Sequence, residues 1–326
     1  MNDIATTARA GRPRASAKLL QGILVPIPTV FDYDGEVDEP GMRALVQFYL
    51  DAQVHGLFPC GSFGMGPAMS VDQRKRVAEL IAETVNGRIP LVVHCGTVDV
   101  FSAIDLAKHA KGLGSLAIAI VPPFYYSDHT EYEILEHYRR IAEAVDSPLF
   151  IYDNPQYSGI HMQVERVLRL KEAIPSIRGI KLNIMSVERA LEYLRLLPED
   201  IAIFSAGVSN LLTGKPKGFD GTVNPPTAHV PELCVSFWDA LALDDFAKAI
   251  HYHYQLDAIA GIVMELWKTR GRIAYKEALK LRGLEIKMFP RWPSKELGPE
   301  DVARLREVHE RVGAGYFVGQ RRVNVV

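Results

Sequence analysis

The chain has 326 residues, of which 48% are hydrophobic and 23% charged, and its formal net charge is −2 at pH 7. This composition is typical of a globular protein. The nearly balanced charge gives no reason to expect nucleic acid or an anionic membrane surface as a partner, so small molecules are the predicted partners. No apolar run approaches the roughly 20 residues that a membrane helix needs.

The cysteines, Cys60, Cys95 and Cys234, are far apart and follow no C-x-x-C spacing. Neither a disulfide framework nor a structural zinc site is therefore expected, and a reducing cytoplasm is the predicted location.

The N-terminal stretch, residues 1–18, carries Arg9, Arg12 and Arg14 among Ala, Ser and Thr. Organelle transit peptides have a similar composition, but the stretch lacks the apolar core of a secretory signal. We predict a flexible, solvated tail.

From residue 19 onward, short apolar runs alternate with amphipathic segments, as in parallel α/β folds. Eight such units occupy about 200 residues, which favours a (β/α)8 TIM barrel over an open doubly wound sheet. No G-x-G-x-x-G motif follows the first strand, which also argues against a dinucleotide fold. The predicted strands are 20–28, 56–60, 89–95, 116–121, 149–152, 177–184, 201–205 and 219–223. The predicted helices between them are 39–53, 70–86, 100–111, 130–145, 164–173 and 186–196, and a short, proline-interrupted helical segment is predicted between the last two strands.

After the eighth unit the sequence becomes wholly helical in character. These segments are more than one barrel needs, so we predict a barrel over residues 19–231 and a C-terminal helical extension, 232–326, packed on it. Two histidines in this part, His251 and His253, face different sides of a helix and make no metal pair. The helices are predicted at 232–243, 245–268, 273–282 and 299–312, and residues 313–326 have no clear assignment.

The sixth predicted strand contains one lysine, Lys181. Strand alternation directs Ile180 and Leu182 to one face and Lys181 with Asn183 to the other. If that face lines a pocket, its apolar surroundings favour the neutral amine, which is a nucleophile toward carbonyls. The alternative is a lysine near the strand end whose ammonium reaches water.

Polar groups at the carboxyl ends of other strands would share this space, because barrel enzymes place their working residues there. The fifth strand ends in Tyr152-Asp153-Asn154-Pro155, one strand before Lys181. Adjacent strands lie about 4.8 Å apart, so the Tyr152 phenol and the lysine amine could face the same pocket, where the phenol could move protons. The alternative is a core tyrosine bonded to backbone.

Two loops add further candidates. The second strand leads into a glycine-rich turn, Gly61 to Pro67, whose backbone N–H groups and Ser62 hydroxyl could hold a carboxylate, although most such turns are only turns. The fourth strand leads into Pro122-Pro123-Phe124-Tyr125-Tyr126, a stiff loop that presents aromatic rings. Such rings often only cover apolar surface.

In these residues the chain resembles the dihydrodipicolinate synthase / N-acetylneuraminate lyase family, class I pyruvate-dependent aldolases built on a (β/α)8 barrel with a helical extension. The resemblance covers about residues 21–300, and its motifs fall in the same order. They are Gly61-Ser62-Phe63-Gly64, which stands where the family has Gly-Thr-Thr-Gly, Tyr152 with Pro155, which matches Tyr-x-x-Pro, and Gly179-Ile180-Lys181, which matches Gly-x-Lys.

The resemblance implies a mechanism without metal or cofactor. Lys181 would add to the keto carbon of pyruvate or another 2-keto acid to form an iminium, and Tyr152 would relay protons. Ser62 and the backbone amides of Ser62 and Phe63 would hold the carboxylate. Tyr125 stands where relatives place a tyrosine that reaches a neighbouring subunit's site, which implies a homodimer or a homotetramer.

Four residues depart from the family pattern. Phe63 replaces a threonine whose hydroxyl links two tyrosines in relatives, and Met65 replaces a frequent glutamate, although residues 64–70 resemble the turn of 2-keto-3-deoxygluconate aldolases. Tyr157 stands where dihydrodipicolinate synthases carry an arginine that pairs with the carboxylate of aspartate semialdehyde, and tyrosine offers no cation. Asn183 replaces a frequent threonine. Selectivity for the aldehyde is expected to depend on the loops around Asn154, Tyr157 and Asn183.

The predicted function is therefore an aldolase that cleaves or forms a 2-keto-3-deoxy acid, with pyruvate as product or donor and an aldehyde as the second substrate. A 2-keto acid dehydratase would use the same iminium. Three alternatives are weaker: dihydrodipicolinate synthase, which Tyr157 disfavours; a keto-acid-binding barrel of low activity, which the loss of the hydroxyl at position 63 would produce; and a metal-dependent aldolase.

Overall fold

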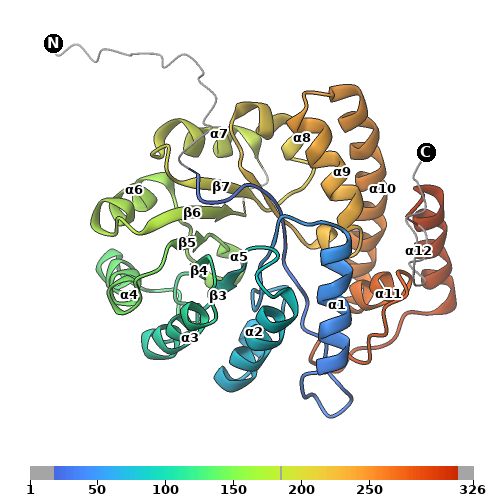
Figure 1. Cartoon of the computed structure of the whole chain (residues 1–326), viewed down its shortest axis with the longest axis horizontal. Coiled ribbons are helices and arrows are strands. Elements are labelled where there is room, and N and C mark those ends of the chain that lie inside the picture. The colour runs from blue at the N-terminus through green and yellow to red at the C-terminus, as the bar shows by residue number, and fades with distance from the viewer. Residues whose placement is uncertain (1–17, 184–185, 315–326) are drawn as a thin grey trace.

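The structure is a computed structural model that describes residues 18–183 and 186–314. In the described part of the chain, eight parallel strands form one sheet in the order β2-β1-β8-β7-β6-β5-β4-β3. A parallel bridge between Leu57 and Leu91 joins its two edges, so the sheet is a near-closed barrel surrounded by helices (Figure 1). The predicted TIM barrel is confirmed. The strands are β1 Gly22–Val25, β2 Gly56–Leu57, β3 Val92–His94, β4 Ala117–Ile120, β5 Leu149–Tyr152, β6 Ile177–Leu182, β7 Ala202–Ser205 and β8 Gly221–Val223.

The strands are shorter than the apolar runs that predicted them, and most helices agree within a few residues. Ser70 caps α2, because its side chain accepts the Gln73 N–H in a capping box. The short helix α5 was not predicted, because Pro155 opens it directly after a strand. The barrel helices are α1 Glu39–Asp51, α2 Val71–Val85, α3 Val100–Gly112, α4 Glu131–Ala144, α5 Pro155–Ser158, α6 Val164–Ala173, α7 Val187–Leu196 and α8 Leu211–Gly214.

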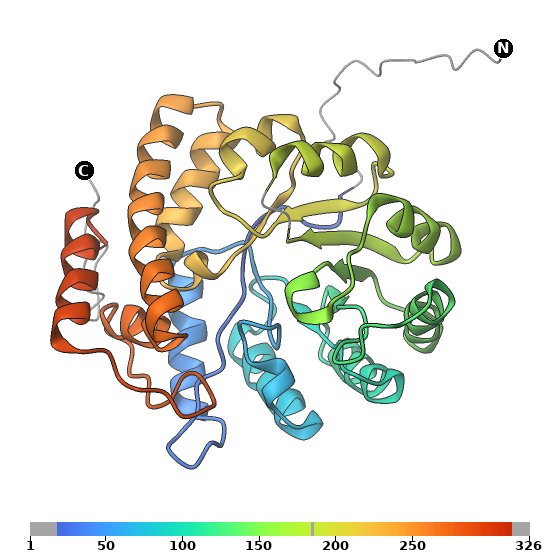
Figure 2. The same cartoon turned by 180° about the vertical axis from the view of Figure 1, so that it is seen from behind.

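The C-terminal extension gathers on one side of the barrel, beside α1, in both views (Figures 1 and 2). It is tied to the barrel by backbone hydrogen bonds, since Phe31 and Met288 exchange N–H···O bonds of 3.1 and 3.0 Å. The predicted helical extension is confirmed, while its boundary at residue 232 stays a prediction. Its helices are α9 Pro231–Ala242, α10 Phe246–Arg270, α11 Ile273–Lys280 and α12 Pro299–Arg311.

Strand alternation divides the apolar core into two clusters. Ile180 and Leu182 belong to the large cluster between strands and helices. A smaller cluster, which includes Phe58, Phe150 and Tyr152, comes from the opposite strand faces and fills the barrel interior. The predicted faces of β6 are thus confirmed, and Lys181 points into the interior.

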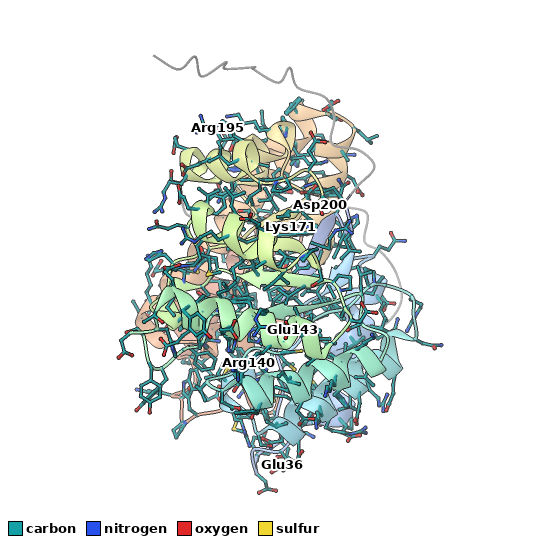
Figure 3. All side chains as sticks on the ribbon, turned by 90° about the vertical axis from the view of Figure 1, so that its left-hand side faces the viewer. Glu36, Arg140, Glu143, Lys171, Arg195 and Asp200 are labelled. Atoms are coloured by element: carbon teal, nitrogen blue, oxygen red, sulfur yellow. The ribbon has the colours of Figure 1, made fainter. Side chains whose placement is uncertain are left out.

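At the amino end of β6 an ion pair fixes the strand. The Lys171 ammonium lies 2.7 Å from an Asp200 carboxylate oxygen, and the two residues are neighbours in Figure 3. The same ammonium donates to the Ile177 carbonyl at 2.8 Å. This anchor lies at the end of β6 away from Lys181, so it holds the strand without occupying its carboxyl end.

Three predictions concern residues outside the described part: the tail over 1–17, residue 184 of the sixth strand, and residues 315–326. No helix among the described residues is long and apolar enough to cross a membrane. Those residues also contain no group of three or more His, Cys, Asp or Glu side chains placed to hold a metal ion.

Candidate active site

Lys181 and Tyr152 are paired across β6 and β5. The lysine is 7% exposed, and its Nζ lies 4.1 Å from the centroid of the Tyr152 ring and 5.4 Å from that of Phe58. Two residues before it, Gly179 makes room for the Phe150 ring, since a Cβ there would lie 2.4 Å from that ring. The amine thus faces aromatic rings, and no carboxylate of the described residues pairs with it.

The Tyr152 hydroxyl belongs to a polar network. Asn154 Nδ2 donates to it at 2.7 Å and to Ser62 Oγ at 3.2 Å, and the hydroxyl itself lies 3.4 Å from Ser62 Oγ. Asn183 Nδ2 in turn donates to Asn154 Oδ1 at 3.1 Å. The structure therefore brings together three predicted site residues around one phenol, namely Ser62 after the second strand, Asn154 after the fifth and Asn183 after the sixth.

The turn from Gly61 to Gly66 is held in a tight conformation. Met65 has a left-handed backbone with φ 62°, and a Cβ on Gly66 would lie 1.8 Å from the Cys60 carbonyl oxygen, so only glycine fits there. Within the described residues, the backbone N–H groups of Ser62 and Phe63 donate to no protein acceptor. These two N–H groups are therefore available to an anion.

Phe63, Tyr125 and Tyr157 are predicted site residues that lie apart from this network. The Phe63 ring is buried against Tyr275 of α11, at 4.7 Å between ring centroids, and against Phe289, at 5.6 Å. Its side chain thus packs on the extension, and only its backbone joins the site. Tyr125 is 81% exposed with φ 79°, and its ring contacts Tyr126.

The sequence interpretation missed two residues beside the site. His94 of β3 presents its ring to Tyr152 at 5.5 Å, and burial lowers its pKa to about 3, so it is neutral. A polar residue inside the apolar third strand was the available signal. Arg272, from the extension, donates to the Ser62 carbonyl at 2.7 Å and to the Tyr157 hydroxyl at 2.9 Å. No local motif marks it.

A separate cavity of about 240 Å³ lies on the helix side of β5 and β6. Asp153 lines it and accepts the Met162 N–H at 3.0 Å. Burial raises the pKa of this carboxyl to about 6. Asn183 is the residue that the cavity shares with the network around Tyr152, and Lys181 does not line it.

Comparisons with known proteins show which family the chain resembles. The sequence profile of the dihydrodipicolinate synthetase family matches residues 19–311. The 4-hydroxy-tetrahydrodipicolinate synthase of Desulfotalea psychrophila is 30% identical over 285 residues, which cover 87% of this chain and 94% of that protein.

Two solved structures are similar to this chain in fold, and each is 25% identical to it in sequence. YagE, a prophage protein of the dihydrodipicolinic acid synthase family from E. coli K12 solved with pyruvate, is 25% identical, has a TM-score of 0.82 and covers 89% of this chain and 98% of its own. CdNal from Clostridium difficile, solved with mannosamine, is 25% identical, has a TM-score of 0.81 and covers 89% and 98%.

Proposed function

The chain belongs to the dihydrodipicolinate synthetase family of class I pyruvate-dependent aldolases and lyases, and on this premise we propose that it cleaves or forms a 2-keto-3-deoxy acid through a Schiff base at Lys181. Pyruvate is the common product or donor. The observation that carries the proposal is a buried amine that faces aromatic rings instead of a carboxylate, directly beside the hydrogen-bonded Tyr152 phenol.

In the direction of cleavage, the Lys181 amine attacks the keto carbon of the 2-keto-3-deoxy acid, and the carbinolamine loses water to form an iminium; in the direction of synthesis, the same step takes place on pyruvate. Tyr152, oriented by Asn154, gives and takes the protons of these steps. The free N–H groups of Ser62 and Phe63 and the Ser62 hydroxyl hold the carboxylate. In cleavage, the C4 hydroxyl of the substrate gives up its proton, the C3–C4 bond breaks, and the iminium accepts the electron pair of that bond. An aldehyde leaves, and the enamine of pyruvate stays on Lys181. Protonation of the enamine carbon and hydrolysis of the resulting iminium then release pyruvate.

Support for pyruvate and for a sugar-like partner comes from the relatives. YagE was solved with pyruvate and CdNal with mannosamine. A dehydratase that uses the same iminium is the second candidate, because the site holds proton-transfer groups on both Tyr152 and Ser62. The two are separated by their products, which are pyruvate plus an aldehyde or a single dehydrated keto acid.

Borohydride reduction in the presence of pyruvate tests the proposal. Intact mass should show one pyruvate-sized adduct per chain, and peptide mapping should place it on Lys181 while the equally buried Lys276 stays unmodified. A folded protein without an adduct on Lys181 would contradict the proposed mechanism.

We also propose that the chain assembles into a dimer or tetramer in the cytoplasm. The support is Tyr125, whose exposed ring and left-handed backbone present an aromatic group away from its own barrel. Sedimentation analysis should show an oligomer that Tyr125→Ala weakens, and a monomer at all concentrations would contradict it.

A further inference from the structure

Arg272 is a buried cation that the C-terminal extension delivers to the rim of the site. It precedes α11 and is 8% exposed. Its Nη1 donates to the Ser62 carbonyl at 2.7 Å and its Nη2 to the Tyr157 hydroxyl at 2.9 Å. A chain of contacts thus runs from Lys181 through Tyr152 and Ser62 to the guanidinium.

Aromatic rings hold this guanidinium in place. Its central carbon lies 5.5 Å from the Trp267 ring centroid, 5.6 Å from that of Trp292 and 6.0 Å from that of Tyr157. Stacked rings orient the planar group without neutralising it. In the described residues no carboxylate pairs with Arg272, whereas Arg270, two residues earlier, is paired with Asp301 at 2.7 Å.

A buried, oriented arginine without a counter-ion is suited to bind an anion from outside. Carbonyl and phenol oxygens satisfy part of its hydrogen-bonding capacity but not its charge. At least two of its five N–H groups remain, because Nη1 contacts only the Ser62 carbonyl and Met65 Sδ and Nη2 only Tyr157. A guanidinium presents its donors as a fork that matches a carboxylate or a phosphate.

We propose that Arg272, with Tyr157, recognises an anionic group, a carboxylate or a phosphate, at the end of the substrate remote from the keto acid. The inference rests on the proposed function, because the remote end is defined by a keto carbon bound to Lys181. The position after the fifth strand carries no cation of its own, but the extension supplies one beside Tyr157. The tyrosine at position 157 therefore does not by itself exclude an aldehyde that carries a carboxylate.

The alternative is that Arg272 only joins the extension to the barrel. Arg291 offers a matched control for that role. It also comes from the extension and donates to barrel carbonyls, those of Gly35 at 3.0 Å and Ala68 at 2.6 Å, and it lies over the Phe31 ring at 5.3 Å. It contacts none of the site residues described above. Arg291→Gln therefore removes a contact between the extension and the barrel without a change in the site.

The experiment compares aldehyde pairs that differ in charge, condensed with pyruvate by the full-length chain. Glyceraldehyde is paired with glyceraldehyde 3-phosphate, and butanal with succinic semialdehyde, and kcat/KM is measured for each. The wild type should prefer the charged member of at least one pair, and the pair that shows the preference identifies phosphate or carboxylate. Arg272→Gln should reduce that preference by about 10- to 100-fold, as expected for the loss of charge-assisted hydrogen bonds.

The preference is a ratio within one variant, so it does not depend on how much of the protein folds. Arg272→Lys should keep part of it because the charge stays and the fork is lost, and Arg291→Gln should keep all of it. The amount of pyruvate trapped by borohydride should be the same in the wild type and Arg272→Gln.

Three results would overturn the inference. They are a wild type without a charge preference, an equal loss on neutral and charged aldehydes in Arg272→Gln, and a higher pyruvate requirement for trapping in that variant, which would assign the arginine to the keto-acid carboxylate. A wild type that traps no pyruvate would refute the proposed function and this inference with it, and is distinguishable from all three.

Discussion

Two lysines of this protein are equally buried, one in the barrel and one in the extension, and they differ in their partners. Lys181 and Lys276 are each 7% exposed. The Lys276 ammonium lies 2.6 Å from Glu296, whereas the Lys181 ammonium meets the rings of Tyr152 and Phe58. Burial alone therefore does not distinguish the lysine that we propose to be reactive from one held in an ion pair.

The difference lies in the group that each amine contacts. A carboxylate at hydrogen-bond distance favours the ammonium, which has no lone pair with which to attack a carbonyl. Aromatic rings attract a cation far less strongly than a carboxylate does, and the phenol beside Lys181 is the group that we propose to exchange protons with the substrate. The barrel lysine therefore lies beside a hydroxyl group and aromatic rings, whereas the extension lysine is held in an ion pair.

Substituting each lysine by methionine tests this comparison most directly. Lys181→Met should abolish the borohydride adduct and lower kcat at least about 1,000-fold, because the nucleophile is gone while the apolar stem remains. Lys276→Met should keep the adduct and most of the activity. An adduct that persists in Lys181→Met and disappears in Lys276→Met would reverse the assignment of the two regions.

Tyr152→Phe separates the two features that surround Lys181. The ring that faces the amine stays, and the hydroxyl bonded to Asn154 is lost. Turnover should fall by about 10²- to 10⁴-fold, the usual contribution of a positioned proton-transfer group, and the pyruvate adduct should form slowly but still map to Lys181. Single-turnover trapping as a function of time measures this, and a wild-type rate in the variant would exclude the phenol as the relay.

The strand-borne part of the site was predictable because its signals are local. Alternation placed Lys181 opposite Ile180, and the spacing of strands placed Tyr152 beside it, so both residues could be assigned from a few neighbours along the chain. The barrel fold was predicted in the same way, from eight repeated strand-and-helix units. The predicted ends of the strands were less accurate, because hydrogen bonding to neighbouring strands determines where each strand begins and ends.

The part contributed by distant segments left no such signal. Arg272 reaches Ser62 across 210 residues of sequence, and the packing of Phe63 on Tyr275 and Phe289 depends on how the extension folds back. An expectation based on the local motif placed Phe63 where relatives have a relay hydroxyl. The structure turns its side chain toward the extension because that apolar cluster buries the ring.

Phe63→Thr tests this boundary between barrel and extension. The ring is 5% exposed in an apolar cluster, so its loss should lower the free energy of unfolding by about 2–4 kcal/mol through the cavity left behind. Phe63→Leu, which keeps an apolar side chain, should lose less. Urea denaturation gives both values, and a gain in turnover without a loss of stability in Phe63→Thr would instead support a missing relay hydroxyl.

The smallest expected effect concerns two buried aspartates, which differ in their partners as the two lysines do. Asp153 is 3% exposed and has no ion pair among the described residues, while Asp220, 2% exposed, lies 3.0 Å from the Lys18 ammonium. Burial raises the pKa of Asp153 from 3.8 to about 6. Between these two values the native state keeps a proton that the unfolded chain releases, so this carboxyl's contribution to stability decreases as the pH rises through that range.

Asp153→Asn removes this titration and keeps an oxygen that can accept the Met162 N–H. Relative to the wild type, the variant should therefore gain about 1–3 kcal/mol of unfolding free energy at pH 7 and little at pH 4. Asp220→Asn should change stability in the opposite direction at pH 7, because it breaks an ion pair and leaves the Lys18 ammonium without its carboxylate. Urea denaturation of the three proteins at both pH values measures the difference, and a loss of stability for Asp153→Asn at pH 7 would show that its carboxylate is stabilised by the surrounding cavity.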